Sequence, residues 1–188
     1  MLRPAHMAAL LLAAAIPLVP AASHAAEAGG IEFAERLPGD PDLELRGAAL
    51  LRYMGLLRVY AAALWVGEGV DSSRVLEDVP KRLEIEYFRS FSAEQFAAST
   101  RLKIGENVSP DEYAHLEPRI EELNQLYRSV QPGDRYAITY LPGRGVELAF
   151  NGAPLGWIEG ADFGAAMFSI WLGQAPLDDA LKRRLLSR

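Results

Sequence analysis

The sequence predicts a single α+β domain, in which one largely antiparallel β-sheet carries helices packed on one of its faces. Two observations support this class. Segments typical of strands occur before and after a central helical block, instead of alternating with helices along the chain. The chain has 188 residues, of which 50% are hydrophobic and 23% are charged, which is enough for one domain with a substantial core.

The first 25 residues have the features of a secretory signal peptide. Arg3 precedes an apolar run at 7–16, and the small residues at 21–25 offer a cleavage site after Ala25. The apolar run is short for a membrane span, and no second run follows it. We therefore expect a signal peptide at 1–25 and an exported, soluble domain at 26–188, in the periplasm or otherwise outside the cytoplasm. An uncleaved anchor is the alternative.

Charge and residue usage exclude several classes of function. The chain has 19 basic and 25 acidic residues, and this net charge of −6 disfavours nucleic acid and anionic membranes as partners. Thiol catalysis and disulfides are impossible because there is no cysteine. Once the signal peptide is removed, His115 is the last histidine, so we predict neither a zinc site nor any other metal or cofactor. His115 itself is expected on the solvated surface.

Strands are expected on both sides of the helical block. The segments that alternate or carry β-forming residues are 31–37, 43–45, 81–89, 135–141, 145–150 and 154–158. The dipeptide Asn151-Gly152 is a strong signal for a two-residue hairpin turn between the last two of them.

Helices are predicted from their capping residues. Ser92 with Gln95, and Ser109 with Glu112, form capping boxes for two central helices. The second helix has an apolar stripe that we assign to the core, made of Leu116, Ile120, Leu123 and Tyr127. Three further helices are expected to be capped by Asp71, Asp162 and Asp178 and to end near Val79, Leu172 and Leu186.

The stretch from Leu51 to Val66 is predicted to be one long strand, bent near Gly55 and apolar on both faces. Alternation places Arg52, Arg58 and Tyr60 on the same face. A buried guanidinium without partners is costly, so these cations are expected to reach water, to form ion pairs, or to bind an anionic ligand. The ion-pair partners inside the fold would be Glu84, Glu86 or Asp162.

Motifs at fixed spacing occur along most of the chain. They are the strand 58–66, Phe88-Arg89, Asn151-Gly152, Asp162-Phe163 and the C-terminal pattern Ile170-Trp171-Leu172-Gly173-x-x-Pro176-x-Asp178-x-x-Leu181-Lys182-x-x-Leu185-Leu186. Together they resemble the exported bacterial branch of the chalcone isomerase-like proteins, and the C-terminal pattern is the most specific part. The resemblance covers nearly all of the chain after the signal peptide. It implies an open-faced sheet with a ligand cleft between the sheet and its helices.

The resemblance implies two possible functions. In plant chalcone isomerases, an arginine on the sheet stabilises the phenolate and the developing enolate while a phenolic enone closes its ring. Relatives without this reaction bind fatty acids and place the same arginine and a tyrosine on the carboxylate. Arg52, which follows the small residues at 47–49, best matches that arginine. Tyr60 stands where the plant enzymes carry a catalytic threonine.

We therefore expect a protein that binds a fatty acid or another amphipathic carboxylate through Arg52, Tyr60 and Arg58, with the apolar tail in the cleft. One alternative is an isomerase, an intramolecular lyase acting on a chalcone-like enone, in which Arg52 and Tyr60 would be catalytic. Another is a non-catalytic structural or partner-binding module. The sequence offers no convergent pair of acid and base, which favours binding over catalysis.

Overall fold

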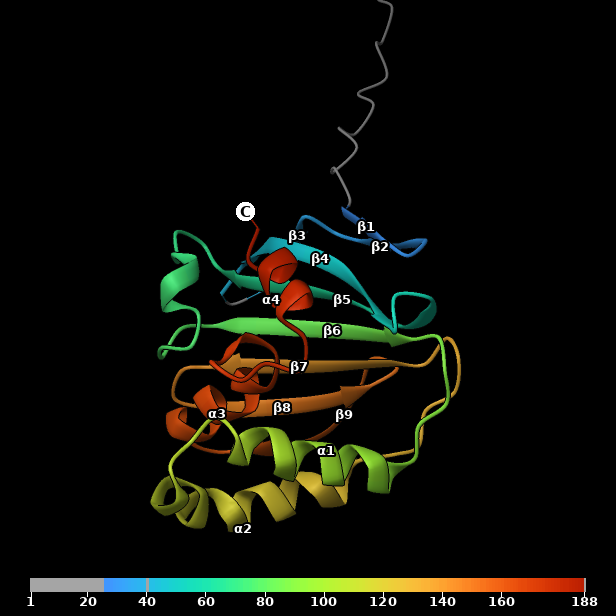
Figure 1. Cartoon of the computed structure of the whole chain (residues 1–188). Coiled ribbons are helices and arrows are strands. Elements are labelled where there is room, and N and C mark those ends of the chain that lie inside the picture. The colour runs from blue at the N-terminus through green and yellow to red at the C-terminus, as the bar shows by residue number, and fades with distance from the viewer. Residues whose placement is uncertain (1–25, 40, 188) are drawn as a thin grey trace, which may run out of the picture.

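The computed structural model describes residues 26–39 and 41–187, so the expected signal peptide lies outside the described residues. One curled antiparallel sheet of seven strands, arranged in chain order, carries the helices on one face (Figure 1). This confirms the α+β prediction. The strands of this sheet are β3 (Arg36–Leu37), β4 (Leu43–Tyr53), β5 (Leu57–Gly67), β6 (Lys81–Tyr87), β7 (Arg135–Leu141), β8 (Gly145–Phe150) and β9 (Ala153–Ile158). A separate hairpin consists of β1 (Ala26–Ala28) and β2 (Ile31–Phe33).

The helices begin at the residues that cap them. They are α1 (Ala93–Gly105), α2 (Pro110–Leu126), α3 (Ala161–Leu172) and α4 (Asp179–Leu185). Both predicted capping boxes are present at the start of α1 and α2, and the Asp178 carboxylate accepts a hydrogen bond from the backbone N–H of Leu181 at the start of α4. These three caps are local in sequence, which is why the sequence predicts them.

One predicted helix start and one predicted helix length are wrong, although Asp71 does cap its short turn. The cap of α3 is Gly160 instead of Asp162, because the Asp162 carboxylate is held by the guanidinium of Arg119 at 2.6 and 2.8 Å. The helix expected after Asp71 is only a short 3-10 turn, Ser72–Arg74. The ammonium of buried Lys81 donates hydrogen bonds to the carbonyls of Glu77 and Val79, at 2.7 and 3.1 Å. In a longer helix these carbonyls would accept hydrogen bonds from backbone N–H groups of the helix.

Apolar residues fill both faces of the sheet near β5. The larger core lies between the sheet and the helices and includes Tyr60, Leu64 and Val66. The smaller core lies on the opposite face, beneath the β1–β2 hairpin, and includes Ala61, Ala63 and Trp65. The predicted double burial is therefore confirmed for the second half of the stretch, from Tyr60 to Val66.

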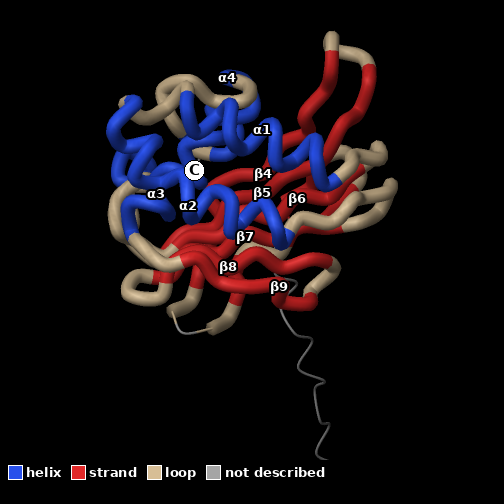
Figure 2. Tube along the Cα trace, turned by 90° about the horizontal axis from the view of Figure 1, so that it is seen from below, coloured by secondary structure: helices blue, strands red, loops and turns tan. Residues whose placement is uncertain are grey.

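The first half of that stretch is a hairpin instead of a bent strand. Strand β4 ends at Tyr53, which pairs with Leu57 at the start of β5. Met54 and Gly55 both have positive φ, at 50° and 72°, and two consecutive left-handed residues reverse the chain in a tight turn. The end of this β4–β5 hairpin projects beyond the helices (Figure 2). Residues 52–58 are all exposed, so this end of both strands lies outside the core.

A β-bulge in β5 changes which side chains share a face. Leu51 pairs with Tyr60 and Arg52 pairs with Arg58, so Val59 is one extra residue on β5. Val59 and Tyr60 consequently both face the helices, whereas Arg58 faces away from them. The predicted common face for Arg58 and Tyr60 is wrong, because alternation fails across a bulge.

Helix α4 packs directly against the backbone of β4 at Gly47. A Cβ atom at this position would lie 2.1 Å from the carbonyl oxygen of Arg184 and 2.8 Å from that of Leu185. Only glycine allows so close an approach of two backbones. This contact fixes the C-terminal helix over the strand that leads to Arg52.

Candidate functional site

A cavity of about 290 Å³ lies between the helix-facing side of the sheet and the helices. Its walls are almost entirely apolar. The aromatic residues that line it are Tyr60, Tyr87, Phe91, Phe96, Tyr127, Tyr136 and Trp171, and the aliphatic ones are Leu51, Val59, Ile85, Ile138, Leu148, Ile170 and Leu177. The remaining lining residues are Gln95, Ser99 and Thr100, all from α1. Such a wall suits a hydrocarbon chain.

The aromatic wall is organised around Tyr87, at the end of β6. Its ring meets those of Tyr60, Phe91, Phe96 and Tyr136 edge to face, with centroids 5.4 to 6.2 Å apart. Edge-to-face contacts of this kind are favourable beyond the apolar area that they bury. The cavity is thus bounded by interlocked rings from the sheet, from α1 and from the segment between them.

Most of the cavity's tyrosine hydroxyls already have partners. Tyr60 accepts a hydrogen bond from the indole Nε1 of Trp171 at 3.3 Å, and the hydroxyls of Tyr127 and Thr100 are 2.8 Å apart. The Tyr136 hydroxyl donates to the carbonyl of Arg128 at 2.8 Å. Among the described residues, the hydroxyl of Tyr87 has no partner.

These hydroxyls are donors at neutral pH and cannot serve as bases. Burial raises the pKa of Tyr60 and of Tyr127, and it raises the pKa of Tyr87 well above its ordinary value of 10.0. For Tyr60, the hydrogen bond from Trp171 opposes this shift and the charge of Asp178 adds to it. A protonated hydroxyl in an apolar wall can donate to a carboxylate or carbonyl oxygen.

The cavity continues into an outer groove near the hairpin. Leu51, Val59, Phe91 and Leu177 line both spaces. The other residues of the groove are Arg52, Tyr53, Met54, Leu57, Arg89 and Asp178. Its charged groups are therefore two arginines and one carboxylate, beside the apolar cavity.

The two arginines of the groove carry uncompensated charge. Arg52 and Arg89 are exposed, and within the described part of the chain neither makes a hydrogen bond or an ion pair. The carboxylate of Asp178 is engaged in capping α4. The groove thus presents two guanidinium groups, each with its full set of donors.

The structure separates the three residues predicted as the site. Tyr60 lines the cavity, and Arg52 lies at its rim, on a part of β4 that β3 does not cover. Arg58 is on the opposite face, where its guanidinium donates a hydrogen bond to the carbonyl of Gly29 and lies 3.9 Å above the ring of Phe88. By register Arg52 projects from the same face as Arg58, and it is nevertheless one of the residues that line the groove, at the uncovered edge of β4.

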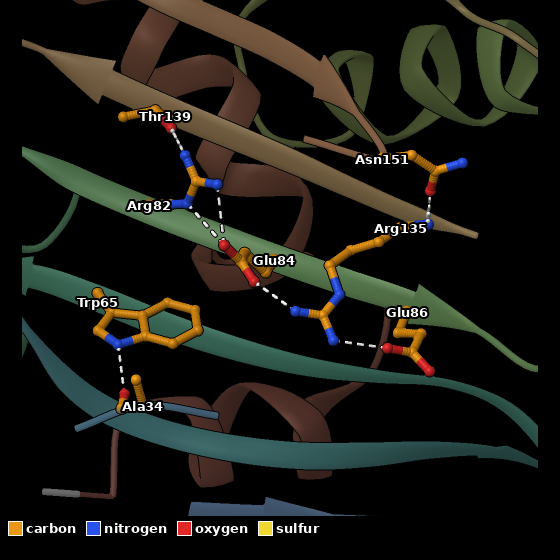
Figure 3. Close-up of polar contacts among 8 residues, drawn as sticks. All are labelled: Ala34, Trp65, Arg82, Glu84, Glu86, Arg135, Thr139 and Asn151. Carbon is orange, nitrogen blue, oxygen red and sulfur yellow. Dashed lines mark hydrogen bonds and ion pairs between the residues drawn. The ribbon is translucent and has the colours of Figure 1, made fainter. Parts of the chain in front are cut away.

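The acidic residues expected as ion-pair partners of Arg52 and Arg58 pair with other cations. On the outer face of the sheet, Arg135 contacts Glu84 at 3.0 Å and Glu86 at 2.6 Å (Figure 3). Arg82 also contacts Glu84, at 2.8 Å. Asp162 is paired with Arg119. These ion pairs occupy the three carboxylates, and Arg52 has no ion-pair partner among the described residues.

Sequence reasoning missed Arg89 as a site residue. Arg89 lies two residues past the end of β6, in a bend, and lines the groove together with Val59 and Phe91. The sequence analysis noted Arg89 within the Phe88-Arg89 motif. Its place beside the cavity could not be predicted without knowing which face of β6 the helices cover. Trp171, the partner of Tyr60, was likewise noted only as part of a motif.

In the described part of the chain, no three histidine or acidic side chains gather closely enough to hold a metal ion. Across 26–39 and 41–187, no helix has both the length and the apolar character that a membrane span requires.

Together, the fold and the site define an α+β protein with an apolar cavity between a curled sheet and its helices. A sequence profile of the chalcone isomerase-like family matches residues 25–187, and the chain belongs to this family. No curated protein sequence matches the chain. The structure is similar to the crystal structure of a fatty-acid binding protein of Arabidopsis thaliana, with a TM-score of 0.67 and 14% identity over 84% of this chain and 92% of that one. At this identity the likeness shows a shared fold.

Proposed function

We propose that this protein binds a fatty acid or a similar amphipathic carboxylate, with its tail in the cavity and its carboxylate at the outer groove. The observation that carries the proposal is the direct continuation of an apolar cavity into a groove with two unpaired guanidinium groups, those of Arg52 and Arg89. The similar Arabidopsis structure belongs to a protein that binds fatty acids, which supports the same ligand class here.

The polar end of the ligand would meet three donors. Arg89 and Arg52 both line the groove in which the carboxylate would lie. Charge-assisted hydrogen bonds from guanidinium groups are about twice as strong as neutral ones and match the two oxygens of a carboxylate. Tyr60 accepts from Trp171, so its own proton is available to the ligand at the inner end of the groove.

The cavity, at about 290 Å³, has the size of a small-ligand pocket, and its apolar lining suits a hydrocarbon tail. The length of that tail is tested with fatty acids of increasing chain length. Ring-closing catalysis is not part of the proposal, since it needs a base and the hydroxyls of the cavity are protonated at neutral pH.

We further propose that binding takes place after export. The signal-like residues 1–25 support this placement, as does the start of the family match at residue 25. Expression in an exporting bacterial host, followed by mass determination of the purified protein, tests it. A mass that starts at Ala26 is expected. An intact mass that includes Met1 would contradict the proposal.

The binding proposal is tested by calorimetric titration with decanoate. Arg89→Ala and Arg52→Ala should each weaken the affinity at least about tenfold, because each removes a charge-assisted contact worth about 1.5–3 kcal/mol. Arg58→Ala is the matched control. Its guanidinium lies across the ladder from Arg52 but on the Gly29 and Phe88 side, so the affinity should stay within about twofold.

A second measurement does not depend on the choice of ligand. Solvent extraction of the purified protein, followed by mass spectrometry, should recover fatty acids or similar amphipathic carboxylic acids. The proposal fails if decanoate does not bind, or if both arginine variants retain full affinity.

A further inference from the structure

The end of the β4–β5 hairpin is an exposed apolar surface, which we call the hairpin tip and define as Tyr53, Met54, Leu56 and Leu57. Their exposed fractions are 63%, 80%, 82% and 50%. Tyr53 and Leu57 pair directly across the ladder, and the turn between them carries the other two. The hairpin tip thus places four large apolar side chains together in water, at the part of the molecule that projects in Figure 2.

The turn itself is not optimised for folding. Met54 and Gly55 have φ values of 50° and 72°, which are those of a type I′ turn. The β8–β9 hairpin also turns through two consecutive residues with positive φ, Asn151 and Gly152, at 49° and 81°. Asparagine is the residue that tolerates this conformation, whereas methionine is strained in it. The strained methionine at the β4–β5 turn is also exposed, so it contributes no packing that would compensate for the strain.

Basic residues surround the hairpin tip. Arg52 and Arg58 form the cross-strand pair immediately behind it, and Arg89 lies in the adjoining groove. No acidic residue occurs between Glu44 and Glu68 in the sequence. The acidic groups on neighbouring elements are Asp178, which caps α4, and Glu27, which lines a second groove beside Arg52. The local charge is therefore positive, although the net charge of the chain is −6.

We infer that the hairpin tip docks on the surface of a bilayer that contains anionic phospholipids. An apolar tip enters the boundary between headgroups and acyl chains, a tyrosine suits that boundary, and arginines behind the tip reach the phosphates. Asp178 lines the same groove as Met54 and Leu57, but the three arginines at and beside the hairpin tip outnumber it. Acidic groups farther than a Debye length of about 8 Å from the lipid surface are screened at physiological salt.

Docking in this orientation places the cavity opening next to the lipid. Met54 and Leu57 belong both to the hairpin tip and to the groove that leads into the cavity. A single-chain amphiphile in the outer leaflet would then reach Arg89 and Arg52 without crossing water. Docking itself does not require the proposed ligand, so the two proposals are tested separately.

Co-sedimentation with vesicles tests the inference. The protein is residues 26–188, which contain both hydrophobic cores in full. It should bind vesicles of phosphatidylglycerol and phosphatidylcholine more tightly than vesicles of phosphatidylcholine alone, and high salt should remove the difference. The double variant Met54→Asn and Leu56→Asn should bind at least about tenfold more weakly. Asparagine at position 54 copies the Asn151 turn, so the fold is preserved.

A second variant reports the docked position. Leu56→Trp keeps the hairpin tip apolar, and its added fluorescence should be quenched by vesicles of brominated phospholipid, unlike that of the three native tryptophans. The inference is overturned if the unaltered protein does not sediment with anionic vesicles. It is also overturned if the asparagine double variant sediments equally well, or if the hairpin tip instead joins two copies of the chain, seen as a dimer that the double variant dissociates. Leu56 lines neither the cavity nor the groove, so decanoate titration of the single variant Leu56→Asn should remain normal while its vesicle binding weakens, which separates a failure of docking from a failure of ligand binding.

Discussion

The indole Nε1 of Trp171 donates a hydrogen bond to the hydroxyl of Tyr60 over 3.3 Å. The bond connects α3 to β5 across the wall of the cavity, and both side chains are buried. Because the tyrosine oxygen accepts from the indole, its own hydrogen is directed to another acceptor. The pair therefore provides an oriented donor inside a wall that is otherwise apolar.

Tyr60→Phe is expected to weaken decanoate binding several-fold and to lower the unfolding free energy by about 1 kcal/mol, since the Trp171 N–H loses its acceptor. Calorimetry and urea denaturation measure the two effects. Tyr127→Phe is the control, because its hydroxyl also lies in the cavity wall but is bonded to Thr100. Equal losses of affinity in both variants would show that Tyr60 has no specific role.

Affinity should depend on the length of the fatty acid in two phases. From hexanoate to decanoate each added methylene should tighten binding about fourfold, as expected for about 0.8 kcal/mol per buried methylene. Once the tail fills the cavity, further methylenes should add nothing, so the affinity of longer acids should level off or fall. A titration series up to stearate checks this. Affinity that keeps rising to stearate would mean that the tail lies elsewhere or that the cavity expands.

Gly47→Ala should lower the unfolding free energy by about 1–3 kcal/mol, because the new Cβ meets the backbone carbonyls of Arg184 and Leu185 and α4 must shift. Gly105→Ala is the control. Its Cβ would only touch the Tyr113 ring at 3.6 Å, near the end of α1, where alanine favours the helix. Urea midpoints should therefore move in opposite directions, and a shift to lower urea in both variants would argue against the α4 contact as the cause.

Acid should weaken the fold through Asp162. Its hydrogen bonds from Arg119 lower its pKa from the ordinary 3.8 to about 2. This carboxylate therefore stabilises the fold fully above pH 3.8, and the contribution disappears as the pH falls to about 2. The side chain is half exposed, so the effect should stay below about 1 kcal/mol. Urea denaturation between these pH values should show a smaller loss for Asp162→Asn than for the unaltered protein. Identical curves would mean that the ion pair does not stabilise the fold.

The features that the sequence predicted correctly are local ones. The capping boxes at Ser92 and Ser109 and the turn at Asn151-Gly152 depend on residues no more than three apart, and the structure contains all of them. The turn at Met54-Gly55 was missed because methionine is a poor residue for a left-handed position, so nothing in the pattern marked a reversal. The turn forms there because β4 and β5 pair on either side of it.

The candidate site was less predictable than the fold, for a physical reason. The face of Arg58 depends on the pairing of β5 with β4, the place of Arg89 beside the cavity depends on which side of β6 the helices cover, and the partners of Glu84 and Glu86 come from β7. Each is a contact between segments distant in sequence. Tyr60 could be placed near the cavity because burial of its strand follows from composition alone.

The extra residue at Val59 has a consequence for comparing members of this family. If a relative has one residue fewer in this region, an alignment gap at Val59 leaves every strand pair and every exposed face unchanged. A gap placed in the Met54–Leu56 turn instead would match Arg58 to a residue on the wrong side of the sheet. With the gap misplaced, a relative's arginine equivalent to Arg58, which here contacts Gly29 and Phe88, would be aligned with Val59. That arginine would then be assigned wrongly to the face of the cavity.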